Sequence, residues 1–246
     1  MAVLPCHRSP RLGEWQALLF ARATLEGRIR DLAYSVSDQN LQQMPEFEDR
    51  ARVLQHLGYL DEERTVQLKG RVACEMNSCD ELICTELVFA GELADYTAEE
   101  CVALLSAFVL QEKQVSEPEL NERLVALKDA AVAHGLRCGE VQHQLGIPTT
   151  PDEYVQSTMR FGLMEVVYEW AKGTPFDEVC QLTDCAEGTI VRCIVRLDET
   201  CREFRNAARL IGDPALLEKM ERAAELIKRD IVFSPSLYVT GAPLPS

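Results

Sequence analysis

Signals that start an α-helix recur at short intervals along the chain. In each signal, a Ser, Thr or Asp side chain accepts a hydrogen bond from the first free backbone N–H groups of a helix, and an acidic residue three positions later strengthens the cap. Five such pairs are present: Thr97 with Glu100, Ser116 with Glu119, Thr150 with Glu153, Thr174 with Asp177, and Asp184 with Glu187. They predict a bundle of about seven helices between Ser78 and Asp230.

Proline and glycine punctuate the same region in the manner of a helical protein. Pro151 and Pro175 fall at first-turn positions, where the missing N–H costs nothing, and Gly91, Gly173 and Gly212 supply stops. No repeat of 30 to 40 residues recurs, so a solenoid is excluded. The fold class predicted from these residues is mainly α, with a helical bundle as its largest part.

The first third of the chain has a different pattern. Apolar residues recur at helical spacing from Glu14 to Val36, and a second helix is predicted from Glu46 to Leu57, ended by Gly58. Two short β-like runs, Thr65–Leu68 and Arg71–Glu75, then flank Lys69-Gly70 and predict a β-hairpin. A helix followed by a hairpin is typical of the tail of a winged-helix unit.

The charge of the chain limits how it can meet nucleic acid. With 246 residues, a net charge of −15 and a pI near 4.8, its surface as a whole repels phosphate. Any RNA contact must therefore come from a local basic strip. The longest nearly apolar run, Cys101–Leu110, is too short to cross a bilayer, and the N-terminus has no signal-peptide pattern. We expect a soluble, intracellular protein that does not contact membranes.

The ten cysteines predict neither a metal site nor disulfides. There is no C-x-x-C motif, and Cys74, Cys79 and Cys84 are spaced so that a helix would scatter them around its surface. Several cysteines stand among apolar residues, where a reduced thiol behaves as a small core side chain. This pattern indicates a reducing compartment.

No motif for catalysis is present. The sequence contains no phosphate-binding loop, no dinucleotide fingerprint and no nucleophile elbow. Five Asp-Glu pairs occur, but none continues to the His or Asp that a DExH or DExD box would require. We therefore predict no catalytic residue, no metal ligand and no cofactor-binding residue.

One stretch, Phe176–Gly212, stands above this background. Its longer helix places Arg192, Arg196 and Glu199 on one face, and Ile190, Ile194 and Leu197 on the other. From Arg192 to Arg209 there are five arginines and three acids. Guanidinium groups in such a row could bind the backbone of a single-stranded nucleic acid.

Two other interpretations of this stretch stay open from spacing alone. It could be an amphipathic surface helix whose arginines pair with its own acids. It could also be a helix-turn-helix that binds DNA, although the overall charge counts against that interpretation.

Four long motifs, in order, closely resemble the DSHCT domain, the C-terminal module of exosome-associated DExH-box RNA helicases. They are "LKGRVACEMNSCDELICTELVFAGEL", "LLSAFVLQEK", "LMEVVYEWAKGTPFDEVCQLTDCAEGTIVRCIVRLDE" and "IKRDIVFSPSLY". Earlier segments, including "LPCHRSPRL" and "SDQNLQQMPEFEDRARVLQHLGYLDEERTVQLKG", are more similar to the superkiller-type branch than to the nuclear branch.

The resemblance implies a division of the chain into parts. Residues 1–45 would form the helix returning from the family's arch, residues 46–77 the C-terminal part of the winged-helix domain, and residues 78–239 the DSHCT bundle. Residues 240–246 would be a disordered tail. No stretch corresponds to the two motor domains, so ATP and Mg²⁺ would bind outside these residues, and the chain alone is expected to be inactive as a helicase.

The resemblance also implies RNA-binding residues. In the family motif EG-x-x-x-R-x-x-x-R-L-x-E, the positions that face RNA correspond to Arg192, Arg196 and Glu199, and a further position on the RNA path corresponds to Glu112. The helix that carries the motif would be the ratchet helix, which grips RNA between ATP-driven steps. Trp170 and Tyr168, which could stack on bases, are predicted to be core anchors instead.

Partners and location follow from the same resemblance. We expect single-stranded RNA, the motor domains of the parent helicase, the tetratricopeptide-repeat and β-propeller subunits of the superkiller complex, and the RNA exosome, in the cytoplasm rather than the nucleus. DNA is not expected. The alternative is a free-standing helical adaptor that binds a protein and no RNA.

Overall fold

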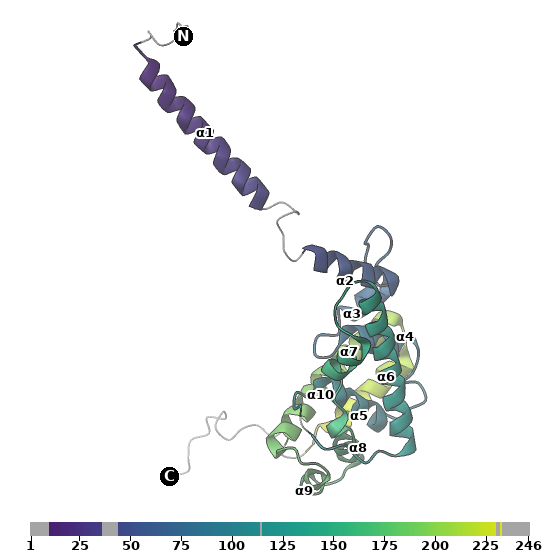
Figure 1. Cartoon of the computed structure of the whole chain (residues 1–246). Coiled ribbons are helices and arrows are strands. Elements are labelled where there is room, and N and C mark those ends of the chain that lie inside the picture. The colour runs from purple at the N-terminus through teal and green to yellow at the C-terminus, as the bar shows by residue number, and fades with distance from the viewer. Residues whose placement is uncertain (1–9, 36–43, 114, 230–231, 233–246) are drawn as a thin grey trace, which may run out of the picture. The chain divides into compact units, whose positions relative to one another are not determined.

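A computed structural model of the chain describes residues 10–35, 44–113, 115–229 and 232. The chain divides into two compact units, residues 1–49 and 50–246 (Figure 1). The first contains α1 (Leu12–Ser35), which confirms the predicted helix, although Val36 lies outside the described residues. None of the α1 side chains is buried, apolar ones such as Leu18 and Ile29 included. The predicted arch origin of residues 1–45 stays a prediction, and residues 240–246 lie outside the described part.

Helix α2 (Met44–His56) agrees with the second predicted helix, and Gly58 follows it with a φ of +77°. The predicted hairpin is wrong. Residues Leu68–Ala73 form a short helix, α3, and the extended pairing in the described chain is a single antiparallel bridge between Leu60 and Val66.

The reason for the error lies in the packing of Gly70. A Cβ at this position would come within 2.6 Å of the Tyr59 carbonyl oxygen, so the glycine allows α3 to pack closely on the preceding loop. Val72, one turn away from Lys69, is fully buried. Tertiary packing therefore converts a local turn signal into a helix, and the winged-helix assignment of residues 46–77 stays a prediction.

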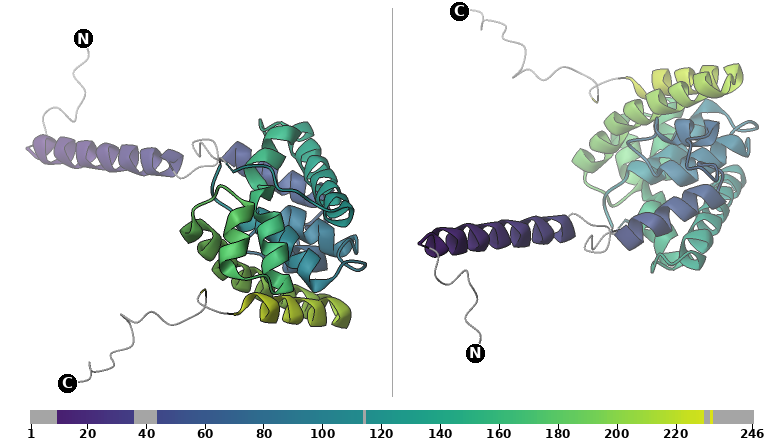
Figure 2. Two further views of the ribbon diagram at one scale, coloured as in Figure 1. Left: turned by 90° about the horizontal axis from the view of Figure 1, so that it is seen from below. Right: turned by 90° about the horizontal axis from the view of Figure 1, so that it is seen from above.

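The larger unit is a helical bundle, as predicted (Figure 1). Its remaining α-helices are α4 (Glu81–Phe89), α5 (Ala98–Val109), α6 (Glu122–Gln144), α7 (Pro151–Thr158), α8 (Met164–Lys172), α9 (Phe176–Val179), α10 (Glu187–Ile211) and α11 (Pro214–Ile227). Two 3₁₀ turns, η3 (Phe161–Leu163) and η4 (Cys180–Leu182), join α7 to α8 and α9 to α10. Helices α10 and α11 lie side by side, as both views of Figure 2 show.

Helix α5 lies at the centre of the bundle. Nine of its 12 residues are buried, because α8, α10, α11 and α6 all pack against it. Leu104 and Leu105, which are adjacent in sequence and so point in different directions, are both fully buried. A helix covered on more than one side reads as continuously apolar, which explains the run that the sequence shows at Cys101–Leu110.

The predicted helix caps have mixed outcomes. Thr97 and Thr150 form complete capping boxes with Glu100 and Glu153. Ser116 and Asp184 cap no helix, and that prediction is wrong for both. They bind each other instead: the Ser116 backbone N–H and hydroxyl donate to Asp184 Oδ1 at 3.0 and 3.1 Å.

The start of α9 is also displaced from the prediction. Pro175, rather than Thr174, occupies the cap position, so the proline precedes the first helical residue. Gly173 and Gly212 end α8 and α10, which confirms the stops predicted there, and both adopt the left-handed conformation.

Trp170 is a core anchor, as predicted, whereas Tyr168 is only half-buried. The indole N–H of Trp170 donates to the Ile227 carbonyl at 3.0 Å, and the Arg229 guanidinium lies 3.5 Å from the centroid of its ring. These contacts fasten the end of α11 to α8. All nine described cysteines are free thiols, and no described helix has the length and hydropathy needed to span a bilayer.

Glu100 offers a test of how the central helix begins. Its carboxylate accepts from the Thr97 N–H and from Nε and Nη2 of Arg123, at 2.8, 2.6 and 2.9 Å. The Arg123 bonds lower the pKa of Glu100 from its usual 4.5, against the effect of burial. Glu100→Gln should destabilise the fold by about 1–3 kcal/mol at pH 7 in urea unfolding.

The pH dependence gives the control. Because the folded-state pKa is lowered, the contribution of the carboxylate is present above its unfolded pKa and is lost as the pH falls through the folded pKa. The difference between wild type and Glu100→Gln should therefore shrink as the pH falls below about 4. Glu99→Gln removes the same charge one position away and should cost little. Equal losses in the two variants, at all pH values, would contradict this role.

Candidate nucleic-acid interface

Helix α10 is long and amphipathic, and its buried side fixes where its charged side points. Ile190, Ile194 and Leu197 are fully buried, which confirms the predicted apolar face. Packing of this face against α5 and α11 leaves Arg192 and Arg196 exposed at the edge of the bundle. The arginines are thus held on a rigid element whose rotation about its axis is set by the core.

Three of the four predicted site residues line one small hollow. It has a volume of about 140 Å³ and is formed where the end of α5 meets the first half of α10. Glu112, which follows the end of α5, lies on one side, and Arg192 and Arg196 of α10 lie on the other. The lining is completed by Val109, Leu110, Gln111, Thr189 and Cys193. Residues about 80 positions apart in sequence are therefore brought together.

The two arginines differ in how they are held. Arg192 Nη2 donates to Thr189 Oγ1 at 2.9 Å, one turn earlier on the helix. The Arg196 guanidinium has no hydrogen-bond or ion-pair partner within the described residues.

The acids nearest to Arg196 along the helix are engaged elsewhere. Asp198 pairs with Lys228 at 2.8 Å, and Glu199 pairs with Arg202. One alternative was that the arginines of this face pair with acids of the same helix. The geometry contradicts that interpretation for Arg196. Its charge is available to a ligand.

The segment that carries Glu112 is positioned by hydrogen bonds from the opposite side. The Arg160 N–H donates to the Ala107 carbonyl at 2.8 Å, and its Nη1 donates to the Leu110 carbonyl at 3.0 Å. Further along, Asp184 accepts the two Ser116 bonds, which lower the pKa of its carboxyl group. Hydrogen bonds therefore fix the chain before Glu112, at Ala107 and Leu110, and after it, at Ser116.

Glu199 does not line the hollow, in contrast to the other predicted residues. It is exposed on the same helix face, and its carboxylate faces Arg202. Sequence reasoning also missed Thr189 and Gln111. The position of Thr189, three residues before Arg192, was the available signal for its contact. Nothing in the local pattern placed Gln111 near α10.

The hollow carries net positive charge. It holds two guanidinium groups and one carboxylate, and burial raises the pKa of the Cys193 thiol to about 12, so the thiol stays neutral. Among the described residues, no three His, Cys, Asp or Glu side chains lie close enough together to hold a metal ion. The guanidinium groups can bind an anion and the carboxylate can accept from a hydrogen-bond donor, so the residue types suit the binding of a ligand.

The comparison with known proteins decides the family. Residues 63–234 match the model of the DSHCT (NUC185) domain. This range includes every residue that lines the hollow. The chain belongs to the DSHCT domain family. This result confirms the resemblance carried by the four sequence motifs.

Proteins named as RNA helicases are among the relatives of this DSHCT domain. The chain is 50% identical over 241 residues to the DExH-box ATP-dependent RNA helicase DExH11 of Arabidopsis thaliana, covering 98% of this chain and 18% of the relative. It is 46% identical over 233 residues to Superkiller complex protein 2 of Homo sapiens, covering 95% and 18%. It is 37% identical over 236 residues to the Exosome RNA helicase MTR4 of Homo sapiens, covering 96% and 23%. The chain thus spans about a fifth of each relative's length, and its identity to the superkiller protein is the higher of the last two.

The division of labour on α10 predicts contrasting effects of two neighbouring substitutions. Arg196→Ala removes an exposed side chain without a partner in the described structure, so unfolding free energy should change by less than about 0.5 kcal/mol. Ile194→Ala empties a fully buried site and should cost about 2–5 kcal/mol. Urea denaturation of both variants measures this. A large loss for Arg196→Ala would show that the arginine is structural.

Proposed function

We propose that this DSHCT domain guides single-stranded RNA for an ATP-dependent 3′-to-5′ RNA helicase that feeds RNA to the exosome for mRNA decay. The observation that carries the proposal is the hollow in which Arg192, Arg196 and Glu112 converge, with the Arg196 guanidinium unpaired within the described residues. The helicase names of the relatives DExH11 and MTR4 support the same role. In this proposal α10 acts as the ratchet helix.

The chemistry of the three side chains suits a single RNA strand. A guanidinium group offers several N–H donors in one plane, which match the oxygens of a phosphate. A carboxylate repels phosphate but accepts hydrogen bonds from a ribose 2′-OH or a base amino group. Glu112 therefore favours a strand that turns its sugars or base edges toward the end of α5, while its phosphates face α10. Glu199, one turn beyond Arg196, extends the same row.

In this proposal, ATP and Mg²⁺ would bind to the motor domains of the parent helicase, and the DSHCT domain would guide the RNA for them. The partners we propose are those domains, the tetratricopeptide-repeat and β-propeller subunits of a superkiller complex, and the RNA exosome, in the cytoplasm. The higher identity to Superkiller complex protein 2 than to MTR4 supports this branch.

Binding of a labelled oligouridylate to the whole chain at low salt tests the proposal. Affinity should be weak, because few cationic contacts act against a net charge of −15. Arg196→Gln and Arg192→Gln should each weaken binding and lower the slope of log K against log[salt] by about 0.7.

Arg222→Gln is the matched control. The variant loses the same positive charge as Arg196→Gln and Arg192→Gln. However, Arg222 lies on α11, pairs with Glu225 at 3.4 Å and does not line the hollow. It should leave binding unchanged. If all three variants bound alike, or if the wild type bound no RNA, the guiding role would be refuted and a protein-binding adaptor would be favoured.

A further inference from the structure

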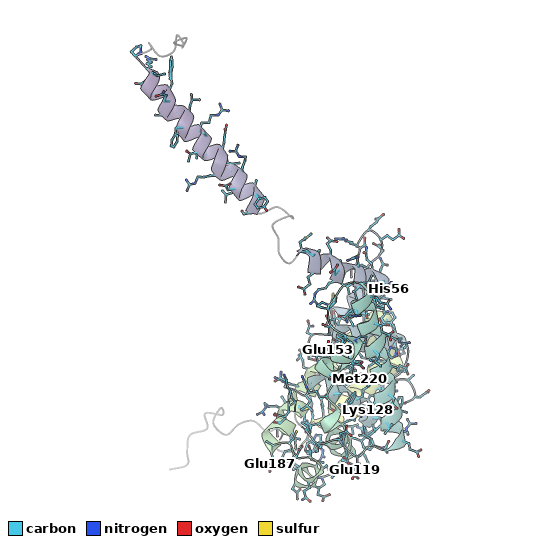
Figure 3. All side chains as sticks on the ribbon, in the orientation of Figure 1. His56, Glu119, Lys128, Glu153, Glu187 and Met220 are labelled. Carbon is cyan, nitrogen blue, oxygen red and sulfur yellow. The ribbon has the colours of Figure 1, made fainter. Side chains whose placement is uncertain are left out.

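A second, larger hollow adjoins the first. It has a volume of about 590 Å³ and shares Leu110 and Glu112 with the first hollow. It extends away from α10, toward α6, α7 and the η3 turn, and Figure 3 labels two of its lining residues, Lys128 and Glu153. The segment at Leu110–Glu112 thus forms a ridge with a hollow on each side.

An aromatic ring and a lysine meet in the second hollow. Lys128 Nζ lies 5.1 Å from the centroid of the Phe161 ring, which is a cation–π contact. Within the described residues, neither Lys128 nor the neighbouring Lys113 has a carboxylate partner. Since Phe161 is half-buried and packs against the core, its ring is held in a fixed place beneath the lysine.

The acids of the second hollow are partly committed to the fold. The Glu153 carboxylate accepts from the Thr150 N–H and hydroxyl at 3.0 and 2.9 Å, and these bonds lower its pKa. Counting Lys113, Lys128 and Arg160 against Glu112, Glu117 and Glu153, the lining is electrically balanced. In a chain of net charge −15, such a hollow repels a polyanion less than the average surface does.

We propose that the RNA strand crosses the ridge and continues into the second hollow. There, one base stacks on the Phe161 ring and its phosphate pairs with Lys128 and Lys113. The flexible Lys128 side chain allows this exchange, since its ammonium group can move from the ring to the phosphate as the base takes its place. This inference rests on the proposed function, because it extends the strand held by Arg192 and Arg196.

Oligouridylates of two lengths distinguish binding at the first hollow from binding at the second. A trimer should bind preferentially at the net cationic first hollow, whereas a decamer should also reach the electrically balanced second one. Lys128→Gln should weaken decamer binding by about fivefold at 50 mM salt, lower its salt slope by about 0.7, and leave the trimer unaffected. Phe161→Leu should weaken the decamer with little change in salt slope, because stacking involves no counterion release.

Lys172→Gln is the matched control. Lys172 also lies over an aromatic ring, at 4.9 Å from the centroid of Tyr168, but it lines neither hollow. It should bind both lengths as the wild type does. Melting temperatures of all variants identify any that are unfolded, and Lys128→Gln, which changes a surface side chain, decides the outcome if Phe161→Leu is unstable.

The outcomes distinguish this inference from the proposed function. If Arg196→Gln weakened both lengths while Lys128→Gln and Lys172→Gln bound the decamer like the wild type, the strand would not enter the second hollow. If Arg196→Gln also had no effect, the first hollow would not bind RNA, and the proposed function would fail as well. A loss confined to the decamer in Lys128→Gln supports the inference.

Discussion

Burial of α5 is the constraint on which the rest of the bundle depends. A helix that buries Leu104 and Leu105 together must be covered from several directions, and α8, α10 and α11 provide that cover. Its first turn is held by Glu100 and Arg123, and its last carbonyls by Arg160. The chain therefore leaves α5 at Leu110 in a defined, extended direction that brings Glu112 to α10.

The same packing decides which charges are used up by the fold. Asp198 binds Lys228 at the end of α11, Glu199 binds Arg202, and Asp184 binds Ser116. Arg196 has no such partner in the part of the chain that the structure describes. An acidic protein can thus present a local cationic site, because the carboxylates nearest to Arg196 on α10 already have partners while its guanidinium group does not.

The sequence predicted much of the fold because its signals were local. Thr97 and Thr150 cap helices through residues three positions away, and Ile190 and Ile194 follow from helical spacing. It failed where distant packing overrides local preference. Gly70 lies in a helix that packs on Tyr59 too closely for a Cβ, and Ser116 binds a residue 68 positions away instead of capping a helix.

The candidate site divides in the same way. Arg192 and Arg196 could be singled out from their spacing on one helix, whereas Glu112 came only from the family resemblance. Its place opposite the arginines depends on how α5 packs, which no local pattern encodes. Gln111 and Thr189 were missed because their relevance arises only when the two segments meet.

Cross-linking to RNA tests the central claim most directly. An oligoribonucleotide that contains 4-thiouridine, bound to the whole chain at low salt and irradiated, should form adducts that mass spectrometry maps to the α10 peptide around Arg192 and Arg196 and to the segment around Glu112. Excess unlabelled RNA should suppress these adducts. Adducts confined to other surfaces, or none above the level of an irradiated sample with Arg192 and Arg196 both changed to Gln, would contradict the account.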